Sequence, residues 1–258
     1  MFSRIKEIYK YREFLKTTTK KEFRGKYKKS FFGVLWSFIN PLLQLAVYSL
    51  VFPYIFKVKE DNYIMFLFVA LVPWSFFSTA VAQSAGSIVY NAGILKKVYF
   101  PREILPISIV ASGAINFLIS CIIIFVALIV SGIGFSWYIL LLPVILLIQC
   151  IVSLAIAFIL SSITVYVRDV EYFINVLLML WMYLTPVLYS ISLIPENFLG
   201  ILNLNPMFHI IVAYRDIFYS KVMPNMTNLG ILFGVSLVLL FISYAIFKKL
   251  EKRFAEEL

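Results

Sequence analysis

The side chains that carry most enzyme chemistry are sparse in this sequence. Its 258 residues include one histidine, His209, and two cysteines, Cys121 and Cys150. A metalloprotease needs a motif of the HExxH type and a serine hydrolase a GxSxG motif, and the sequence has neither. The cysteines lie inside apolar runs without a CxxC signature, so we expect neither a zinc site nor a disulfide framework. We predict no catalytic residue and no metal site, and expect His209 to be an interface or loop residue.

Nucleotide chemistry is also missing from the sequence. No GxxxxGK[ST] phosphate loop is present, so ATP cannot bind by that route. The 13 acidic residues are scattered, which argues against the clustered carboxylates that a membrane phosphatase or glycosyltransferase needs. We therefore predict no cofactor in this chain. If ATP drives the protein, the nucleotide and its Mg²⁺ must bind to another subunit.

The composition indicates a protein whose solvent is the bilayer. Hydrophobic residues make up 62% of the chain and charged residues 14%, against about 45–50% and about 25% in ordinary soluble domains. A soluble fold of this size cannot hide so much apolar surface. The net charge of +10 could suit nucleic acid or an anionic membrane surface. Because the basic residues flank the apolar runs, we expect a membrane partner and no nucleic acid.

The gaps between charged residues predict the membrane spans. Five stretches lack Asp, Glu, Lys and Arg: 30–56, 62–95, 104–167, 172–195 and 222–247. A membrane helix needs about 20 residues, and the third stretch is long enough for two helices separated by a turn at Ser131–Gly134. We predict an all-α integral membrane protein with six transmembrane helices, near 31–56, 63–84, 106–131, 137–163, 173–191 and 229–247.

The distribution of basic residues predicts the orientation of the chain. Of the 23 Lys and Arg residues, all but Lys57, Lys59, Arg215 and Lys221 fall on one side of the six predicted spans. Cytoplasmic loops carry the excess of basic residues. Both the N- and the C-terminus are therefore expected in the cytoplasm.

A largely apolar segment, 195–228, is not expected to form a seventh span. Asn203, Asn205, Arg215 and Asp216 are costly in lipid, and another span would move the basic tail outside. We expect two short helices on the outer side, with Asn205 as an N-cap and Pro206 at the first helical position. An ordinary external loop and a re-entrant hairpin both remain open from these residues alone.

Two cytoplasmic segments combine basic charge with helical apolar spacing. Residues 1–30 read as an amphipathic interface segment on the inner leaflet, or as a basic tail that only fixes topology. In the loop after the second span, Ile88, Leu95 and Tyr99 recur at helical spacing and Pro101 ends the segment. A short helix held between two spans can act as a lever, although a simple surface helix would show the same pattern.

The predicted spans carry no charged residue in their interiors. This absence argues against ion-coupled transporters, proton pumps and voltage sensors. Five aromatic residues could line a path through the protein, because aromatic faces stack on sugar rings: Trp36, Tyr48, Trp181, Tyr183 and Tyr189. An uncharged aromatic path suits a neutral or weakly charged glycan, while lipid-facing packing is the plainer role for any one of them.

Several motifs resemble those of one transporter family. Residues 27–41, YKKSFFGVLWSFINP, resemble the first-span signature of type 2 ABC exporter permeases. Residues 91–106, NAGILKKVYFPREILP, are similar to the gate and coupling region of the branch that exports polysaccharides. The Arg-Asp pair of Val167–Val170 and the segments Thr185–Tyr189 and Leu204–Met207 match later signatures of that branch. The resemblance covers essentially the whole chain.

The resemblance implies a permease that exports a polysaccharide of the O-antigen kind, carried on undecaprenyl diphosphate, across the bacterial cytoplasmic membrane. Two permease copies would work with two copies of an ATPase, with the first and fifth spans shaping the channel. It implies that the two outer helices guard the exit, through Asn205, Pro206 and Arg215. The residues implied in coupling and gating are Asn91, Leu95, Lys96, Lys97, Arg102, Glu103, Arg168 and Asp169. As a further hypothesis, Lys96 and Lys97 meet the lipid diphosphate.

Three alternatives remain open at this stage. Within the family, the cargo could be teichoic acid or a capsular polymer. A drug or lipid exporter of the same superfamily would be stimulated by small amphiphiles. A membrane enzyme acting on polyprenyl-linked sugars would turn over without ATP and need a polar residue such as His209.

Overall fold

The computed structural model describes residues 2–25, 30–56 and 62–258 of the chain. Tyr27–Lys29 of the first predicted motif, and Lys57 and Lys59 of the predicted outer side, lie outside these residues. Within the described ranges the fold is helical and contains no strand. This agrees with the predicted all-α class.

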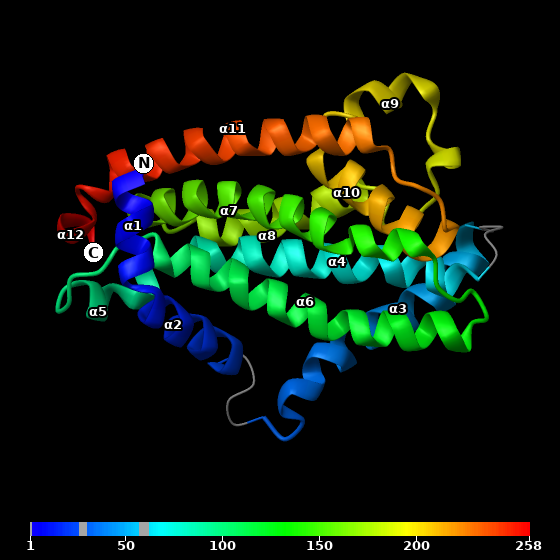
Figure 1. The fold of residues 1–258 in the computed structure, drawn as a ribbon, viewed down its shortest axis with the longest axis horizontal. Coiled ribbons are helices and arrows are strands. Elements are labelled where there is room, and N and C mark those ends of the chain that lie inside the picture. The colour runs from blue at the N-terminus through cyan, green and yellow to red at the C-terminus, as the bar shows by residue number, and fades with distance from the viewer. Residues whose placement is uncertain (1, 26–29, 57–61) are drawn as a thin grey trace.

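Long apolar helices form the body of the molecule (Figure 1). Four stretches are long and apolar enough to cross a membrane: α4 (Tyr63–Ala85), α6 (Ile104–Val130), α7 (Leu142–Tyr166) with the 3₁₀ turn η3 before it (Trp137–Leu141), and α11 (Met226–Glu251). At about 1.5 Å rise per residue each exceeds the ~30 Å hydrocarbon core. Two further apolar helices are α3 (Trp36–Phe56) and α8 (Val170–Tyr183).

Helix α4 lies at the centre of the bundle, whereas α11 lies at its edge. The most apolar part of α4 is 78% buried, and that of α11 only 22%. Helix α4 contacts α3, α6, α7 and α8, while α11 packs mainly on α7. Because α4 is enclosed by protein, polar side chains on it face neighbouring helices or cavities and not lipid.

A buried chain of hydrogen bonds joins three helices in the core. The Gln149 side chain of α7 donates to the Pro73 carbonyl of α4 at 2.8 Å. The Tyr214 hydroxyl of α10 (Pro206–Arg215) donates to the Gln149 amide oxygen at 2.9 Å. Gln149 and Tyr214 are fully buried. Since unpaired polar groups are costly in an apolar interior, these bonds fix the relative positions of α4, α7 and α10.

The fifth predicted span, 173–191, differs from the structure. Helix α8 has 14 residues and ends at Tyr183, which at about 1.5 Å per residue is only about 21 Å. The chain then turns through Leu184–Tyr189, where Thr185 and Val187 are fully buried. Pro186 has no N–H to continue the helical ladder, so the helix ends inside the predicted span.

The segment after α8, for which two short helices were predicted, forms several short helical elements. They are the 3₁₀ turn η4 (Ile191–Leu193), α9 (Glu196–Leu202), α10 and the five-residue π-helix η5 (Asp216–Ser220). The Asn205 side chain accepts from the Met207 N–H at 3.0 Å, with Pro206 at the first helical position, which confirms the predicted cap. Helix α10 packs against α4, α7 and α11, so it is part of the bundle and not a surface loop.

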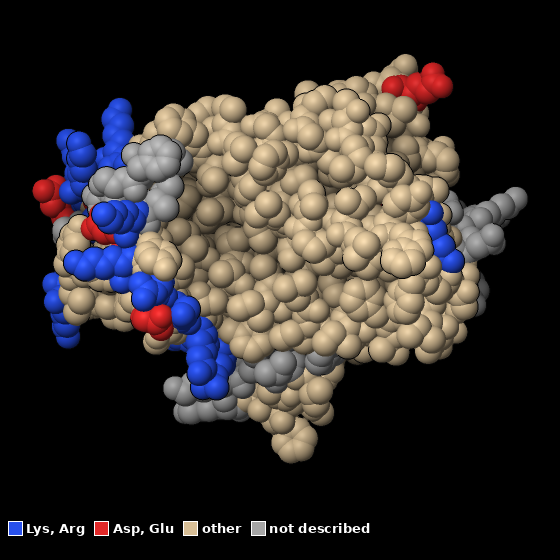
Figure 2. All heavy atoms as spheres, in the orientation of Figure 1, with Lys and Arg blue, Asp and Glu red and all other residues tan. Residues whose placement is uncertain are grey.

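The 3₁₀ turn η1 (Gly33–Leu35) directly precedes α3, and the short helices not yet named gather at one end of the bundle, together with both chain termini (Figure 1). They are α1 (Phe2–Lys10), α2 (Arg12–Gly25), the 3₁₀ turn η2 (Val89–Asn91), α5 (Ala92–Leu95) and α12 (Phe254–Glu257). Lys and Arg side chains crowd this end in the space-filling view, and the middle of the same face carries almost none (Figure 2). We call it the basic end.

Candidate functional site

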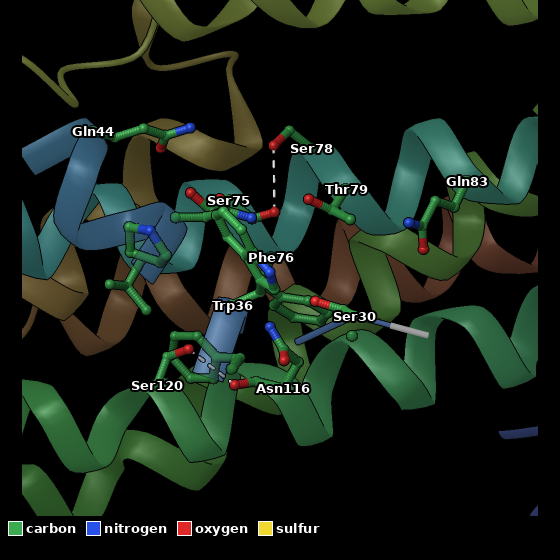
Figure 3. A pocket seen from close by; sticks show the side chains of 15 residues that line it. Ser30, Trp36, Gln44, Ser75, Phe76, Ser78, Thr79, Gln83, Asn116 and Ser120 are labelled. Atoms are coloured by element: carbon green, nitrogen blue, oxygen red, sulfur yellow. Dashed lines mark hydrogen bonds between the residues drawn. The ribbon is translucent and has the colours of Figure 1, made fainter. Parts of the chain in front are cut away.

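A polar cavity of about 830 Å³ lies between α3, α4 and α6 (Figure 3). None of the described residues in its wall is charged. The polar lining residues are Ser30, Asn40, Gln44, Ser75, Ser78, Thr79, Gln83, Asn116 and Ser120, accompanied by Trp36. We refer to this space as the polar cavity.

The floor of the polar cavity is one face of α4. Ser75, Thr79 and Gln83 follow one another at intervals of four residues, so they stack along a single side of the helix. Asn116 and Ser120 face them from α6, and Asn40 and Gln44 come from α3. Thr79 and Gln83 are exposed although they belong to the most enclosed helix. Hydroxyl and amide groups exposed within an apolar helix bundle indicate a water-filled or ligand-filled path.

The close approach of α4 and α6 below the cavity depends on Gly113. A Cβ atom at this position would lie 2.8 Å from the Phe76 ring of α4. Glycine therefore lets that ring lie against α6. The contact keeps the polar faces of the two helices on the same side.

Two smaller cavities continue the polar face of α4. One, of about 410 Å³, lies between α4 and α8 and shares Ser78, Thr79 and Gln83 with the polar cavity. The other, of about 490 Å³, lies at the basic end and is lined by residues of α2, η2, α4, α6 and α8. We call it the basic-end cavity. Gln83 lines all three spaces, so α4 presents a continuous polar face from the polar cavity to the basic end.

Only one of the five aromatic candidates lines the polar cavity, namely Trp36. Trp181 donates its indole N–H to Asn205 at 2.9 Å and packs edge-on against Phe77. The Tyr189 hydroxyl donates to the Tyr183 carbonyl at 2.9 Å, and Tyr48 packs against the apolar core. The sequence reasoning missed the serine, threonine and amide residues of α4. The signal that could have found them is their four-residue spacing within an apolar span.

Arg102 and Glu103 point into the protein at the basic end. Glu103 is fully buried, and its carboxylate forms an ion pair with Lys248 of α11, with Lys248 Nζ and Glu103 Oε1 2.8 Å apart. The Tyr244 hydroxyl donates to the same carboxylate at 3.3 Å. Arg102 donates to the Glu251 carbonyl and lies over the Phe254 ring. These two residues tie the start of α6 to the end of α11, and a buried Glu103 is not a surface contact.

The other residues predicted for coupling lie at the same end. Lys96, Lys97, Arg168 and Asp169 are exposed, and Leu95 packs partly against the apolar cluster around Phe100. The Tyr166 hydroxyl, just before Arg168, donates to the Leu250 carbonyl at 2.8 Å. Segments 89–103 and 167–169 therefore share one end of the bundle although they are far apart in the sequence.

The N-terminal helices are docked on this end and not left free. Phe14 of α2 packs against Phe100 with ring centroids 4.7 Å apart. The Tyr99 hydroxyl donates to Glu7 of α1 at 3.0 Å. Within α2, the exposed Glu13 accepts from Lys16, and this bond lowers the pKa of that carboxyl.

At the opposite end, Asn205 and Arg215 both bond to the turn that follows α8. The Asn205 amide donates to the Thr185 hydroxyl at 2.9 Å, joining α10 to the end of α8. Arg215 is buried, donates to the Val187 carbonyl at 2.8 Å and lies over the Phe66 ring with its guanidinium carbon 3.6 Å from the centroid. They hold the turn after α8 against α4. Nearby, a ring nitrogen of His209 lies 2.9 Å from the Asn203 carbonyl oxygen.

The sequence was compared with families and with curated proteins. Residues 13–219 match the ABC-2 type transporter family. The chain is 37% identical to the O-antigen export system permease protein RfbA of Myxococcus xanthus, over the full length of both chains. It is 36% identical to a protein of the same name from Klebsiella pneumoniae, over 95% of this chain and 94% of the relative. The polysialic acid transport protein KpsM of Escherichia coli is 22% identical over 90% of this chain and 91% of its own.

The family match covers most of the chain, and the relative from Myxococcus xanthus matches it end to end. The four long apolar helices agree with a membrane protein. The chain therefore belongs to the ABC-2 type transporter family and is a multi-pass protein of the bacterial inner membrane.

Proposed function

We propose that this chain is the channel-forming permease subunit of an ATP-driven exporter for O-antigen polysaccharide, carried on undecaprenyl diphosphate. Two copies form the membrane unit, and two copies of a separate ATPase subunit bind ATP and Mg²⁺. The observation that carries the proposal is the polar cavity, whose wall, over the residues that the structure describes, offers amide and hydroxyl groups and no charge. Neutral sugars present the same kinds of hydrogen-bonding groups to their surroundings.

The relatives support the choice of cargo. Two of them carry the name of an O-antigen export permease and match nearly the whole chain. The polysialic acid transport protein is more distant, at 22% identity. An uncharged wall also favours a polymer without many fixed charges, because a polyanion would have no counter-charge inside the membrane.

We propose six membrane spans, formed by α3, α4, α6, α7, α8 and α11, with both termini in the cytoplasm. The gathering of Lys and Arg at the end that holds both termini supports this orientation (Figure 2). In this arrangement α9 and α10 enter the bundle from the outer side as a re-entrant pair. The buried side chains of α10 support its place at membrane depth.

The ATPase is proposed to act at the basic end. Lys96, Lys97, Arg168 and Asp169 are exposed there and form the contact surface, with Leu95 and Asn91 supporting the short helix between them. Arg102 and Glu103 pass the motion to α11 through Lys248 and the Glu251 carbonyl. Lys96 and Lys97 are also placed to meet the lipid diphosphate at the inner surface.

The first test is genetic and uses the native host. Deletion of the gene is expected to remove the surface polysaccharide and to leave lipid-linked glycan inside the cell, and the tagged chain should purify with an ATPase in equal numbers. If the deletion strain keeps its surface O-antigen but loses a capsular or teichoic polymer, the cargo is that polymer instead. ATPase activity stimulated by small amphiphiles would indicate a drug or lipid exporter, and sugar turnover without ATP would indicate an enzyme.

A second test probes the polar cavity. Thr79→Val and Gln83→Leu remove hydrogen-bonding groups while keeping side-chain size, so surface glycan should fall several-fold with unchanged amounts of folded protein. Ile122→Val, on the exposed lipid-facing side of α6, serves as the control. Full export by the Thr79→Val/Gln83→Leu double variant would contradict the role of the cavity.

A further inference from the structure

Two consecutive residues of η2, Tyr90 and Asn91, line the basic-end cavity, and we call the opening that they bridge its mouth. The cavity, of about 490 Å³, is lined by Lys21 and Glu22 of α2, by Glu171 and Asn175 of α8, and by Gln83 of α4. Since Gln83 also lines the polar cavity, this is the part of the polar path nearest the basic end.

Tyr90 reaches from the end of α4 to the first turn of α8. Its ring lies directly on Gly86, where an added Cβ atom would stand 2.3 Å from ring carbon Cε2. Its hydroxyl donates to the carboxylate of Glu171. This hydrogen bond raises the pKa of Tyr90, so the phenol stays protonated and remains a donor. Glycine at 86 is thus what allows the ring to lie flat across the mouth.

Asn91 makes the corresponding contact on the other side. Its amide oxygen accepts from Lys21 of α2 at 2.9 Å. Its amide nitrogen donates to the Ser87 carbonyl at 2.8 Å, which fixes the side chain against the end of α4. Two neighbouring residues of η2 therefore hold α8 on one side and α2 on the other.

We infer that Tyr90–Glu171 and Lys21–Asn91 form a double latch that closes the mouth of the basic-end cavity, and that movement of η2 and α5 opens it. Both contacts start from the same 3₁₀ turn, so one displacement breaks both. The interpretation of this double latch as a gate for glycan rests on the proposed function.

The two ends of segment 89–103 differ in how firmly they are held. The latch contacts are solvent-exposed, and Tyr90 is 70% exposed, so each contact is weak. At the other end Glu103 is fully buried and paired with Lys248. Because the side-chain contacts of segment 89–103 are firm at Glu103 and weak at Tyr90 and Asn91, the η2 end is the one that moves more easily, and this movement opens the mouth.

The test measures access to the cavity in membranes that hold the complete transporter. Ala82, which lines both the basic-end cavity and the cavity beside α8, is changed to cysteine in a chain whose Cys121 and Cys150 are replaced by alanine. Inside-out vesicles are treated with a membrane-impermeant maleimide. Tyr90→Phe, which removes one hydroxyl, is expected to speed labelling about threefold to tenfold, because a hydrogen bond to a charged group is lost.

Matched variants separate the latch from general loosening. Tyr172→Phe removes the same atom from an exposed tyrosine next to Glu171 and should leave the labelling rate unchanged. Gly86→Ala keeps both latch partners but displaces the Tyr90 ring, so it should speed labelling. Glu171→Gln keeps an acceptor and should resemble the parent, whereas Glu171→Ala should resemble Tyr90→Phe.

The outcomes that overturn the inference are defined in advance. Labelling of Tyr90→Phe at the parent rate, or equal acceleration by Tyr172→Phe, would show that the contact does not close the mouth. Size-exclusion profiles of the purified variants check that each is folded. The labelling rate does not depend on the identity of the cargo, so a latch result and a failed glycan test remain distinguishable.

Discussion

At the scale of single residues, the buried polar groups of this protein act mainly as fixed connections between helices. Gln149 is the clearest case, because its amide accepts from Tyr214 and donates to the Pro73 carbonyl in an apolar core. Neither partner has water as an alternative at this depth. The position of α10 against α4 therefore depends on one side chain of α7.

Replacing Gln149 by leucine is expected to lower the free energy of unfolding by about 2 kcal/mol, because the Tyr214 hydroxyl is left unpaired. The measurement is thermal unfolding of the purified protein in detergent. Tyr214→Phe removes the hydroxyl itself, so the Gln149→Leu/Tyr214→Phe double variant should lose less than the sum of the two single changes. Strictly additive losses would contradict a coupled pair.

The chemistry of single positions was only partly predictable from the sequence. The Asn205 cap followed from residue type and from the proline after it, and the structure confirms it. The inward direction of Glu103 could not be predicted, because a glutamate beside an arginine in a basic loop is typical of a surface. Its burial depends on Lys248, which is distant in the sequence.

At the scale of elements, the joint between α6 and α11 is the strongest charged contact of the basic end. Lys248 reaches both Glu103 and Glu251, and Arg102 adds a bond to the end of the same helix. A buried carboxylate is tolerated only while its partner is present. Loss of either Glu103 or Lys248 alone should therefore lower the stability of the folded protein strongly, whereas loss of both charges together should lower it little.

Lys248→Met is expected to destabilise the folded protein by about 3–5 kcal/mol, because it leaves Glu103 buried and unpaired. The Glu103→Gln/Lys248→Met double variant should regain most of that stability. Lys249→Met, at the exposed neighbouring position, is the control and should change little. Equal stability of Lys248→Met and Lys249→Met would refute the importance of the pair. Midpoints of thermal aggregation in detergent report each value.

Helix positions were easier to predict than the faces they present. The stretches free of charge located α4, α6, α7 and α11 within a few residues. The polar cavity was not predicted, since a charge-free span gives no hint of which side meets protein. Its residues come from three helices, and only the packing of α3 and α6 against α4 brings them together.

At the scale of the whole molecule, the separation of charge along the long axis predicts the orientation in the membrane. Gly93 and Asn197 are exposed at opposite ends of the proposed arrangement, and a side chain at Gly93 meets no other atom within 4 Å. A cysteine at 93 should react with an impermeant maleimide only in inside-out vesicles, and a cysteine at 197 only in intact spheroplasts. Labelling of both from the same side would refute the six-span topology.

The short length of α8 has a consequence for the lipid around the protein. Its helical part is about 21 Å long, against the ~30 Å of a hydrocarbon core. The turn that follows is held by Tyr63 of α4 and Arg215 of α10, which donate hydrogen bonds to the Leu188 and Val187 carbonyls. Hydrophobic mismatch of this kind is relieved by local thinning of the bilayer. We expect the bilayer beside α8 to be thinned locally, and in the proposed transport this thinning would lower the barrier for a polyprenyl tail to stay in the lipid while its head group enters the protein.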